Sequence, residues 1–596
     1  MPEKVEKEFF MATTRRSFLT RTIAETAAQP IAAAAVTAAL PPLAVIVYNR
    51  LAYGPRPNDI AAFNSRPGDD IAKLTAWVDE QLNPASIVDA ECDARLAAAR
   101  IKIRYDADMN NKYPAVNEAR PLQLLNSNTA DLWQRVSNGA WPERMRGFEE
   151  VRVATWLRAR HSERQLYELL VDFWHNHFNV NAGAEAMIAS MLPVYDRAVI
   201  RTHALGNFRV FLEEVAKSTV MMYYLDNYNN VASGGEGGNE NYARELFELH
   251  TFSTDNYFKF YDDRTQIPKL PDGVTPAGYI DGDVYEAASC LTGWTINKTN
   301  GNFVFDPNTH YNGTKEVLGR IIRTSDVKDN PQREAQIVYD MLANHPGVAR
   351  NIIGKLCRRL ISDDISAMGD LIDEAVAVWI AQKDAPDQLR QVVRVILLSA
   401  EFRATWGKKV KRPFEAVMSY LRATNAELPI DVASLPKSNT NPTPDPNKGG
   451  FWDGLFWTYG PTGHRLFEWP TPTGHPDLAT YWTSTNSTLR RWNLPYLLTQ
   501  EWSGNVKMPD ITDWNPDAET RTVTQIVDAW IERLFGYAIP DASRQAIITF
   551  FAAGSSPIER PKPTAKAPDW NNNDGLKQRY ISMIQLLVAT PGYHNR

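Results

Sequence analysis

Histidines and carboxylates concentrate in two short stretches of this sequence. Residues 172–178 read DFWHNHF and contain His175 and His177, and residues 239–251 read NENYARELFELHT and contain His250. Imidazoles with carboxylates are the donors of zinc, manganese and iron sites, and they also serve in general acid–base catalysis. The two stretches therefore form the predicted functional site.

A metal ion shared by His175 and His177 requires a particular backbone conformation. On a continuous helix, residues two apart project about 200° from each other, whereas in an extended chain they point to one side. The asparagines and the glycine that follow favour an end of the helix near Asn176. We therefore predict that the helix ends there and that His175, His177 and Glu245 bind a divalent metal, either Zn, Mn or Fe.

The second stretch has the composition of an acidic helix whose charges are spaced to pair. Arg244 lies four residues after Glu240 and four before Glu248, so one guanidinium can hold both carboxylates. Glu245 has no such partner, and His250 lies at the helix end, where the carbonyl pole favours a cation. We predict Glu245 and His250 as catalytic residues. The predicted orienting or structural residues are Asn176, Asn239, Glu240, Arg244 and Glu248.

Three interpretations of this cluster remain open. Glutamates and arginine with histidine partners can lock helices together as a structural polar core. The same residues can hold a metal, or they can form a metal-free acid–base site. The sequence contains no GxSxG elbow, HExxH motif, P-loop or Rossmann glycine fingerprint, so the serine hydrolase, zincin and nucleotide-binding classes lose support.

Helical periodicity dominates the elements that must position these residues. Ser162 and Gln165 are spaced as a capping box, and a stripe from Leu166 to Trp174 follows at helical spacing. The one strand-like stretch is 303–305. The fold class is predicted as mainly α, a large multi-helix domain with minor β elements and long loops. Further predicted helices cover residues 74–98, 133–160 with a break at Pro142, 193–202, 207–217, 239–250, 283–292, 333–404 with an interruption near Asp363, and 576–589.

Five sequence blocks carry a resemblance to a known family. Besides the two stretches above, they are residues 283–294 (DVYEAASCLTGW), 411–415 (KRPFE) and 474–476 (GHP) followed by Trp482, with His475 where the family has an aromatic. From about residue 48 to the end, the chain resembles the bacterial "domain of unknown function 1800" family. The resemblance implies an exported protein that is often encoded beside another exported protein, and it brings no catalytic residues with it.

The N-terminus has the pattern of an export signal. Residues 14–19 read TRRSFL, and an uncharged, alanine-rich stretch interrupted by prolines runs from 30 to 48. We predict a twin-arginine signal over 1–39, recognition by the twin-arginine export machinery, and a periplasmic or extracellular mature protein without a transmembrane segment. The predicted parts are a helical core domain over 48–433, a polar linker over 434–450, and an aromatic-rich C-terminal part of the same domain over 451–596.

Composition narrows the functional classes. The net charge of −6 gives no reason to expect nucleic-acid binding, and three cysteines do not make a disulfide framework. The basic run 408–412 is predicted as a solvated face, and the seven tryptophans of 451–514 as core anchors or, alternatively, sugar-stacking platforms. We predict a metal-dependent hydrolase acting on an extracytoplasmic polymer or envelope component. The alternative is a non-catalytic exported binding or assembly protein whose polar blocks form a structural core.

Overall fold

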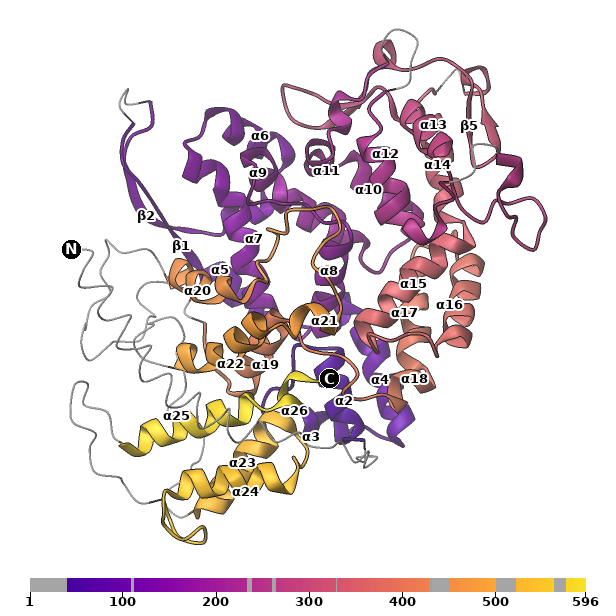
Figure 1. The fold of residues 1–596 in the computed structure, drawn as a ribbon. Helices are drawn as coiled ribbons and strands as arrows, with labels where there is room; N and C mark the ends of the chain where they lie inside the picture. The colour runs from indigo at the N-terminus through magenta and orange to yellow at the C-terminus, as the bar shows by residue number, and fades with distance from the viewer. Residues whose placement is uncertain are drawn as a thin grey trace. The chain divides into compact units, whose positions relative to one another are not determined.

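Helices make up most of the described chain, which confirms the mainly α fold class (Figure 1). The computed structural model describes residues 40–108, 112–232, 238–259, 264–327, 330–428, 430, 451–499, 521–561 and 575–596. The predicted signal over 1–39 and linker over 434–450 lie outside these ranges. Contacts group Pro41–Arg596 as one unit. Among the described helices, none has the length and apolar character needed to cross a membrane.

The α-helices are α2 (Leu43–Arg50), α3 (Asp59–Asn64), α4 (Asp70–Gln81), α5 (Ala90–Ala98), α6 (Thr129–Asn138), α7 (Trp141–His161), α8 (Gln165–His177), α9 (Ala186–Val194), α10 (Phe208–Lys217), α11 (Thr219–Tyr224), α12 (Asn241–Glu245), α13 (Asp281–Leu291), α14 (Arg333–Ala343), α15 (Pro346–Leu360), α16 (Gly369–Ala381), α17 (Gln388–Leu398), α18 (Ala400–Ala404), α19 (Pro413–Ala423), α20 (Phe451–Tyr459), α21 (Ala479–Trp482), α22 (Thr485–Thr499), α23 (Val523–Phe535), α24 (Asp541–Ala552), α25 (Gly575–Val588) and α26 (Pro591–His594). Single 3-10 turns are η1 (Pro84–Ser86), η2 (Gln123–Asn126), η4 (Asn227–Asn229), η6 (Thr254–Asn256), η7 (Arg264–Gln266), η8 (Pro307–Thr309), η9 (Thr324–Asp326) and η11 (Gly460–Thr462).

Two π-helical turns extend α-helices of the predicted site region. They are η3 (Tyr195–Arg201), which continues α9, and η5 (Leu246–Thr251), which continues α12. A π-turn inserts an extra residue per turn and re-aims the side chains that follow it, and such turns are frequent at functional sites. The second predicted stretch is therefore helical, as expected, but its last six residues have a wider turn than an α-helix.

Several predicted helix boundaries need correction. The break at Pro142 is confirmed between α6 and α7, and Asn207 caps α10 as its side chain accepts from the Val210 amide. The single helix predicted over 74–98 is two helices separated by η1. The capping box at Ser162 does not form, because the Ser162 hydroxyl donates to Asp89 at 2.6 Å and α8 begins at Gln165.

The strands form three antiparallel hairpins in the described residues. They are β1 (Arg100–Tyr105) with β2 (Val116–Pro121), β3 (Trp294–Ile296) with β4 (Phe303–Phe305), and β5 (Lys315–Val317) with β6 (Arg320–Ile322). The predicted strand-like stretch is β4. Three-residue strands carry too little alternation to be recognised in the sequence, so β3, β5 and β6 were not predicted.

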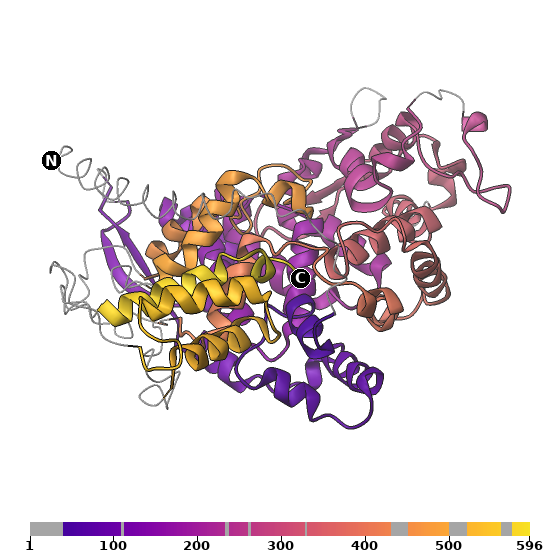
Figure 2. The same ribbon diagram turned by 60° about the horizontal axis from the view of Figure 1, so that its bottom comes forward.

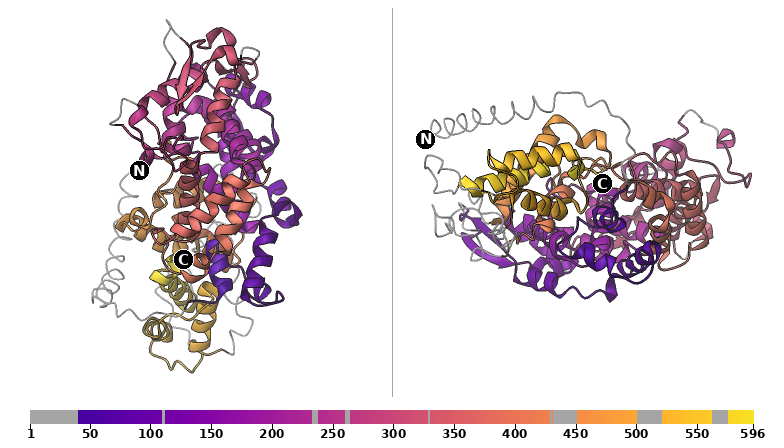
Figure 3. Two further views of the ribbon diagram at one scale, coloured as in Figure 1. Left: turned by 90° about the vertical axis from the view of Figure 1, so that its right-hand side faces the viewer. Right: turned by 90° about the horizontal axis from the view of Figure 1, so that it is seen from below.

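Helix α7 lies between two hydrophobic clusters. Its Val151 belongs to the first, which is built from α2 to α18, and its Trp156 belongs to the second, which is built mainly from α19 to α26. Helices α15, α16 and α17 pack side by side in the first part (Figure 3), and α23, α24 and α25 stack in the second (Figure 2). The three cysteines are buried and free, so they serve as small core residues.

Candidate functional site

Helix α8 runs without a break through both histidines of the first block. The helix ends at His177, close to the predicted end near Asn176, but both histidines still lie within it. On this continuous helix the two imidazoles point to different sides and find different partners. The structure thus separates two residues that the sequence pattern had placed on one metal ion.

His175 forms a dyad with a carboxylate that the sequence analysis did not identify. Its Nε2 donates to Asp196 Oδ1 at 2.9 Å, and Asp196 lies on η3. Burial opposes the charge of Asp196, but Arg201 and His175 outweigh it and hold the pKa of this carboxyl well below its ordinary value. The other ring nitrogen of His175 has no partner among the described residues. His175 also lines a small hollow, with Tyr53 and Thr155 among its walls.

His177 joins the two predicted blocks. Its Nε2 donates to the backbone carbonyl of His250 at 3.2 Å, and the two rings lie 6.3 Å apart. Lys355 on α15 approaches from the other side, with Nζ 3.4 Å from His177 Nδ1 and 3.1 Å from the Leu249 carbonyl. Burial, followed by the Lys355 charge, lowers the pKa of His177 well below its ordinary value. His177 is therefore a neutral link between α8, η5 and α15.

His250 is a buried imidazole rather than an exposed catalytic group. It is 0 % exposed, and its neighbours include the rings of Phe178 at 5.1 Å and Tyr242 at 6.2 Å. Burial lowers the pKa of His250 to about 3, so the ring is neutral. Neither ring nitrogen has a hydrogen-bond partner among the residues that the structure describes. Its position supports η5 from within the core.

Arg244 organises the acidic helix as predicted. Its guanidinium contacts Glu240 at 2.9 Å and Glu248 at 3.4 Å. A third carboxylate, Asp281 at the start of α13, lies 3.1 Å away. Asn239 accepts a hydrogen bond from the Asn241 amide at 3.0 Å and so supports the beginning of α12. Arg244 therefore ties the second block to the third.

Glu245 is the one carboxylate of this helix without a partner in the described parts of the chain. It is partly buried and makes no hydrogen bond or ion pair there. Burial, followed by the neighbouring Glu248, raises the pKa of Glu245 to about 7, with Arg244 opposing. Tyr224 lies within electrostatic range, since burial and then the Glu245 charge raise the pKa of its phenol to about 12. Glu245 can thus hold or release a proton near neutral pH.

The predicted ligands do not fit a single metal ion. His175 Nε2 is engaged by Asp196, while His177 lies beside the Lys355 amino group, whose positive charge would repel a divalent cation. In the described residues no group of three or more potential ligands converges. Metal binding by these residues therefore stays a prediction, which metal analysis of the purified protein can test.

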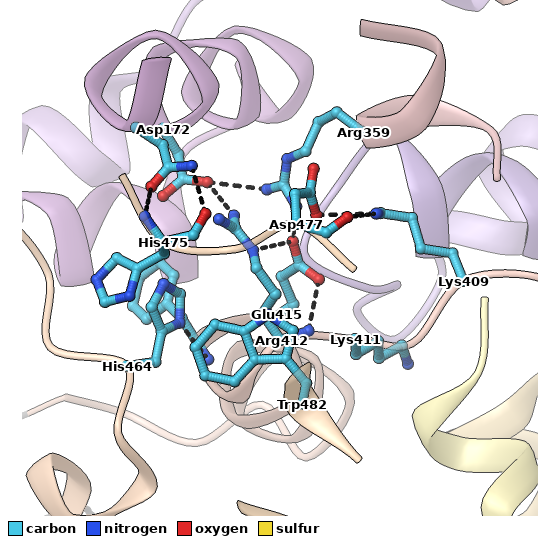
Figure 4. Close-up of polar contacts among 12 residues, drawn as sticks. Asp172, Arg359, Lys409, Lys411, Arg412, Glu415, His464, His475, Asp477 and Trp482 are labelled. Atoms are coloured by element: carbon cyan, nitrogen blue, oxygen red, sulfur yellow. Dashed lines mark hydrogen bonds and ion pairs between the residues drawn. The ribbon is translucent and has the colours of Figure 1, made fainter. Parts of the chain in front are cut away.

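A buried ion cluster that the sequence analysis missed lies beside α8 (Figure 4). Asp172 accepts hydrogen bonds from Arg359 at 2.8 Å and from Arg412, and both arginines also contact Glu415. The arginines are at most 2 % exposed. Lys409 joins the cluster through Asp477 at 2.8 Å. We define the buried ion cluster as Asp172, Arg359, Lys409, Arg412, Glu415 and Asp477.

The basic run 408–412 is therefore not the solvated face that was predicted. Lys409, Lys411 and Arg412 are 2–3 % exposed. Lys409 pairs with Asp363, just after α15, and with Asp477, just after Pro476. Arg412 pairs with Asp172 on α8 and with Glu415 at the start of α19. Lys411 has no carboxylate partner in the described residues and donates to the Ser419 hydroxyl at 3.1 Å. Burial of charge is tolerated only with such partners, and sequence spacing does not reveal partners this distant. The available signal was the presence of Asp172 and Glu415 inside blocks of the family resemblance.

Asn176, predicted as an orienting or structural residue, links the GHP block to α8. Its amide donates to the His475 carbonyl at 2.9 Å and accepts from the His475 amide at 2.7 Å. Gly474 has a φ of 71°, and a Cβ there would lie 2.1 Å from the Asn176 carbonyl oxygen, so only glycine fits. The His475 ring packs 4.7 Å from Trp469 and 4.5 Å from His464, where an aromatic side chain would also fit.

Comparison with known proteins identifies a family and no characterised relative. A family model described as "Protein of unknown function (DUF1800)" matches residues 46–595. No curated protein matches the chain, and no solved structure matches it either. The match spans nearly the whole chain and confirms the resemblance seen in the sequence blocks.

Proposed function

The chain belongs to the DUF1800 family of proteins of unknown function, and from that premise we propose an exported hydrolase of an extracytoplasmic polymer or envelope component. Glu245 is its proposed acid–base residue. The observation that carries the proposal is an unpaired, partly buried carboxyl whose pKa is raised to about 7. A general acid or base works best when its pKa lies near the working pH.

Glu245 and Glu248 have different surroundings, so they can have different roles. Glu248 is held by Arg244, whereas Glu245 has no cationic contact. When protonated, Glu245 can donate to a leaving-group oxygen, and the resulting carboxylate can then take a proton from the attacking water. Glu245 is also partly exposed, so a polymer can reach it, whereas His250 is enclosed and acts as a positioning residue.

The proposal is tested by following polymer breakdown with the purified mature protein. New reducing ends and soluble fragments are measured on a panel of polysaccharides and cell-wall sacculi. Glu245→Gln keeps the size of the side chain and removes its proton transfer, so the rate should fall roughly 10²- to 10⁴-fold. Glu80→Gln changes an exposed glutamate on α4 that pairs with Arg66, and this control should retain the rate. Full activity of a correctly folded Glu245→Gln protein would exclude the proposed role.

A second candidate function is the non-catalytic binding or assembly protein. The observation that favours it is that Asp172, Asn176 and Glu415 have all their contacts inside the fold, as a structural polar core requires. Under this alternative, the folded wild-type protein cleaves no member of the panel. Glu245→Gln then changes neither polymer integrity nor the folded yield.

A further inference from the structure

A ledge of aromatic and hydroxyl side chains lies on the surface beside α8. We define the ledge as Trp469, Thr471, Thr473 and Tyr481. The Trp469 indole donates to Thr471 Oγ1 at 2.9 Å, approaches Thr473 Oγ1 at 3.3 Å, and meets the Tyr481 ring edge-on at 5.9 Å. Both threonines are exposed, and Tyr481 is 44 % exposed. The ledge thus presents aromatic surface and hydroxyl groups and contains no charged side chain.

The end of α8 and the first connection after it hold the ledge in place. Asn179 donates through its amide to the Trp469 carbonyl at 3.1 Å and to the Thr471 carbonyl at 2.7 Å. The Trp469 ring rests on His475, which Asn176 holds from the other side (Figure 4 shows His475). A surface fixed in this way loses little conformational freedom when it binds a ligand.

The ledge borders Glu245 through Tyr224. The Tyr224 hydroxyl donates to the Pro470 carbonyl at 3.2 Å, between Trp469 and Thr471 in the chain. The same phenol lies in the field of the Glu245 carboxyl. A chain bound along the ledge therefore passes close to the proposed acid–base residue.

We infer that the ledge binds an uncharged polysaccharide and that this polysaccharide is the substrate class presented to Glu245. The inference rests on the proposed function for its catalytic part. The apolar C–H faces of sugar rings stack on indole and phenol rings, and their hydroxyls exchange hydrogen bonds with threonine. Because no cation lies on the ledge, it has no feature that selects a phosphate-bearing chain.

The inference is tested by binding, measured separately from cleavage. The mature protein is sedimented with microcrystalline cellulose and with chitin, and it is run in native gels containing soluble starch, xylan or mannan. Trp469→Ala should weaken retention about tenfold or more on the polymer that binds the wild type. Trp457→Ala is the matched control, because this tryptophan on α20 is 85 % exposed and lies outside the ledge. It should bind as the wild type does.

A second variant separates stacking from loop damage. Trp469→Phe keeps an aromatic face and removes the indole donor, so it should retain more binding than Trp469→Ala, and both should keep the wild-type melting temperature. Unchanged binding by Trp469→Ala, or equal losses in Trp469→Ala and Trp457→Ala, would overturn the inference. Absence of wild-type binding to every polysaccharide would also overturn it.

The two proposals fail in different ways. Glu245→Gln should bind the polysaccharide as the wild type does and cleave it more slowly. If Trp469→Ala abolishes binding while Glu245→Gln cleaves normally, polysaccharide binding by the ledge is supported and the proposed role of Glu245 is wrong. If the protein uses Glu245 to cleave a polymer that is not a polysaccharide, the substrate class inferred from the ledge is wrong and the hydrolase proposal is supported.

Discussion

Replacing Asp172 by asparagine should destabilise the folded unit by about 3–5 kcal/mol. The Asp172 side chain is 11 % exposed and pairs with Arg359 and Arg412, which are 1 % and 2 % exposed. Asparagine preserves the shape but removes the charge, so two buried guanidinium groups lose a shared carboxylate. Glu415 still contacts both guanidinium groups, but it also contacts Arg596, so its single charge leaves part of the buried positive charge uncompensated, which is strongly unfavourable.

This loss converts into a measurable shift in melting temperature. The unfolding entropy is about 2.1 cal/mol/K per residue, or roughly 1.2 kcal/mol/K for the unit Pro41–Arg596. The midpoint of Asp172→Asn should therefore fall by about 3–4 °C in scanning calorimetry at a fixed scan rate.

Asp79→Asn is the matched control for this measurement. Asp79 pairs with Arg394 through two contacts of 2.6 and 3.1 Å, but both side chains are nearly half exposed. An exposed pair contributes about 0–1 kcal/mol, so the control should shift the midpoint by less than about 1 °C. Equal shifts in the two variants would refute the reasoning that burial makes the cluster stabilising. A normal midpoint with lost activity would instead place Asp172 in the chemistry.

Three further predictions concern export, pH and metal. Replacing Arg15 and Arg16 together by lysine should leave unprocessed precursor in the cytoplasm on immunoblots of cell fractions, and normal export would contradict the twin-arginine signal. The pKa of Glu245 is about 7 in the folded protein and 4.5 in the unfolded chain. The free energy of unfolding therefore contains a favourable contribution from protonated Glu245 below about pH 4.5, and this contribution is lost as the pH rises through 7. The melting temperature of Glu245→Gln should therefore equal that of the wild type at pH 4.5 and exceed it at pH 8. A lower melting temperature of the variant at pH 8 would contradict the raised pKa. His177→Ala should leave the metal content of the purified protein unchanged by elemental analysis, whereas loss of one equivalent of Zn, Mn or Fe would re-establish the metal-dependent hydrolase.

Local sequence patterns were sufficient for much of the helical fold. The apolar stripe of α8, the extent of α10 and the break at Pro142 depend on residues within one or two turns of each other. The pairing of Arg244 with Glu240 and Glu248 also follows from the helical repeat alone. The third partner of Arg244, Asp281, comes from another helix and was not predictable.

The sequence could not predict where a side chain points when its interaction partner is distant in the chain, because the tertiary structure determines this. His175 contacts Asp196 on another helix, and Arg412 contacts Asp172, which lies 240 residues away in the sequence. The sequence showed that these residues are polar and that they stand in dense blocks, but a polar side chain inside a fold adopts the position where its charge is compensated. That position depends on which helices pack together.

The sequence by itself therefore determined the family, the mainly α fold and the residues among which a site is to be sought. Only the tertiary structure separated the neutral histidines His177 and His250 from the buried ion cluster and from the unpaired carboxyl of Glu245. The physical reason is that helical periodicity acts over a few residues, whereas desolvation and charge compensation act through space between segments far apart in the chain.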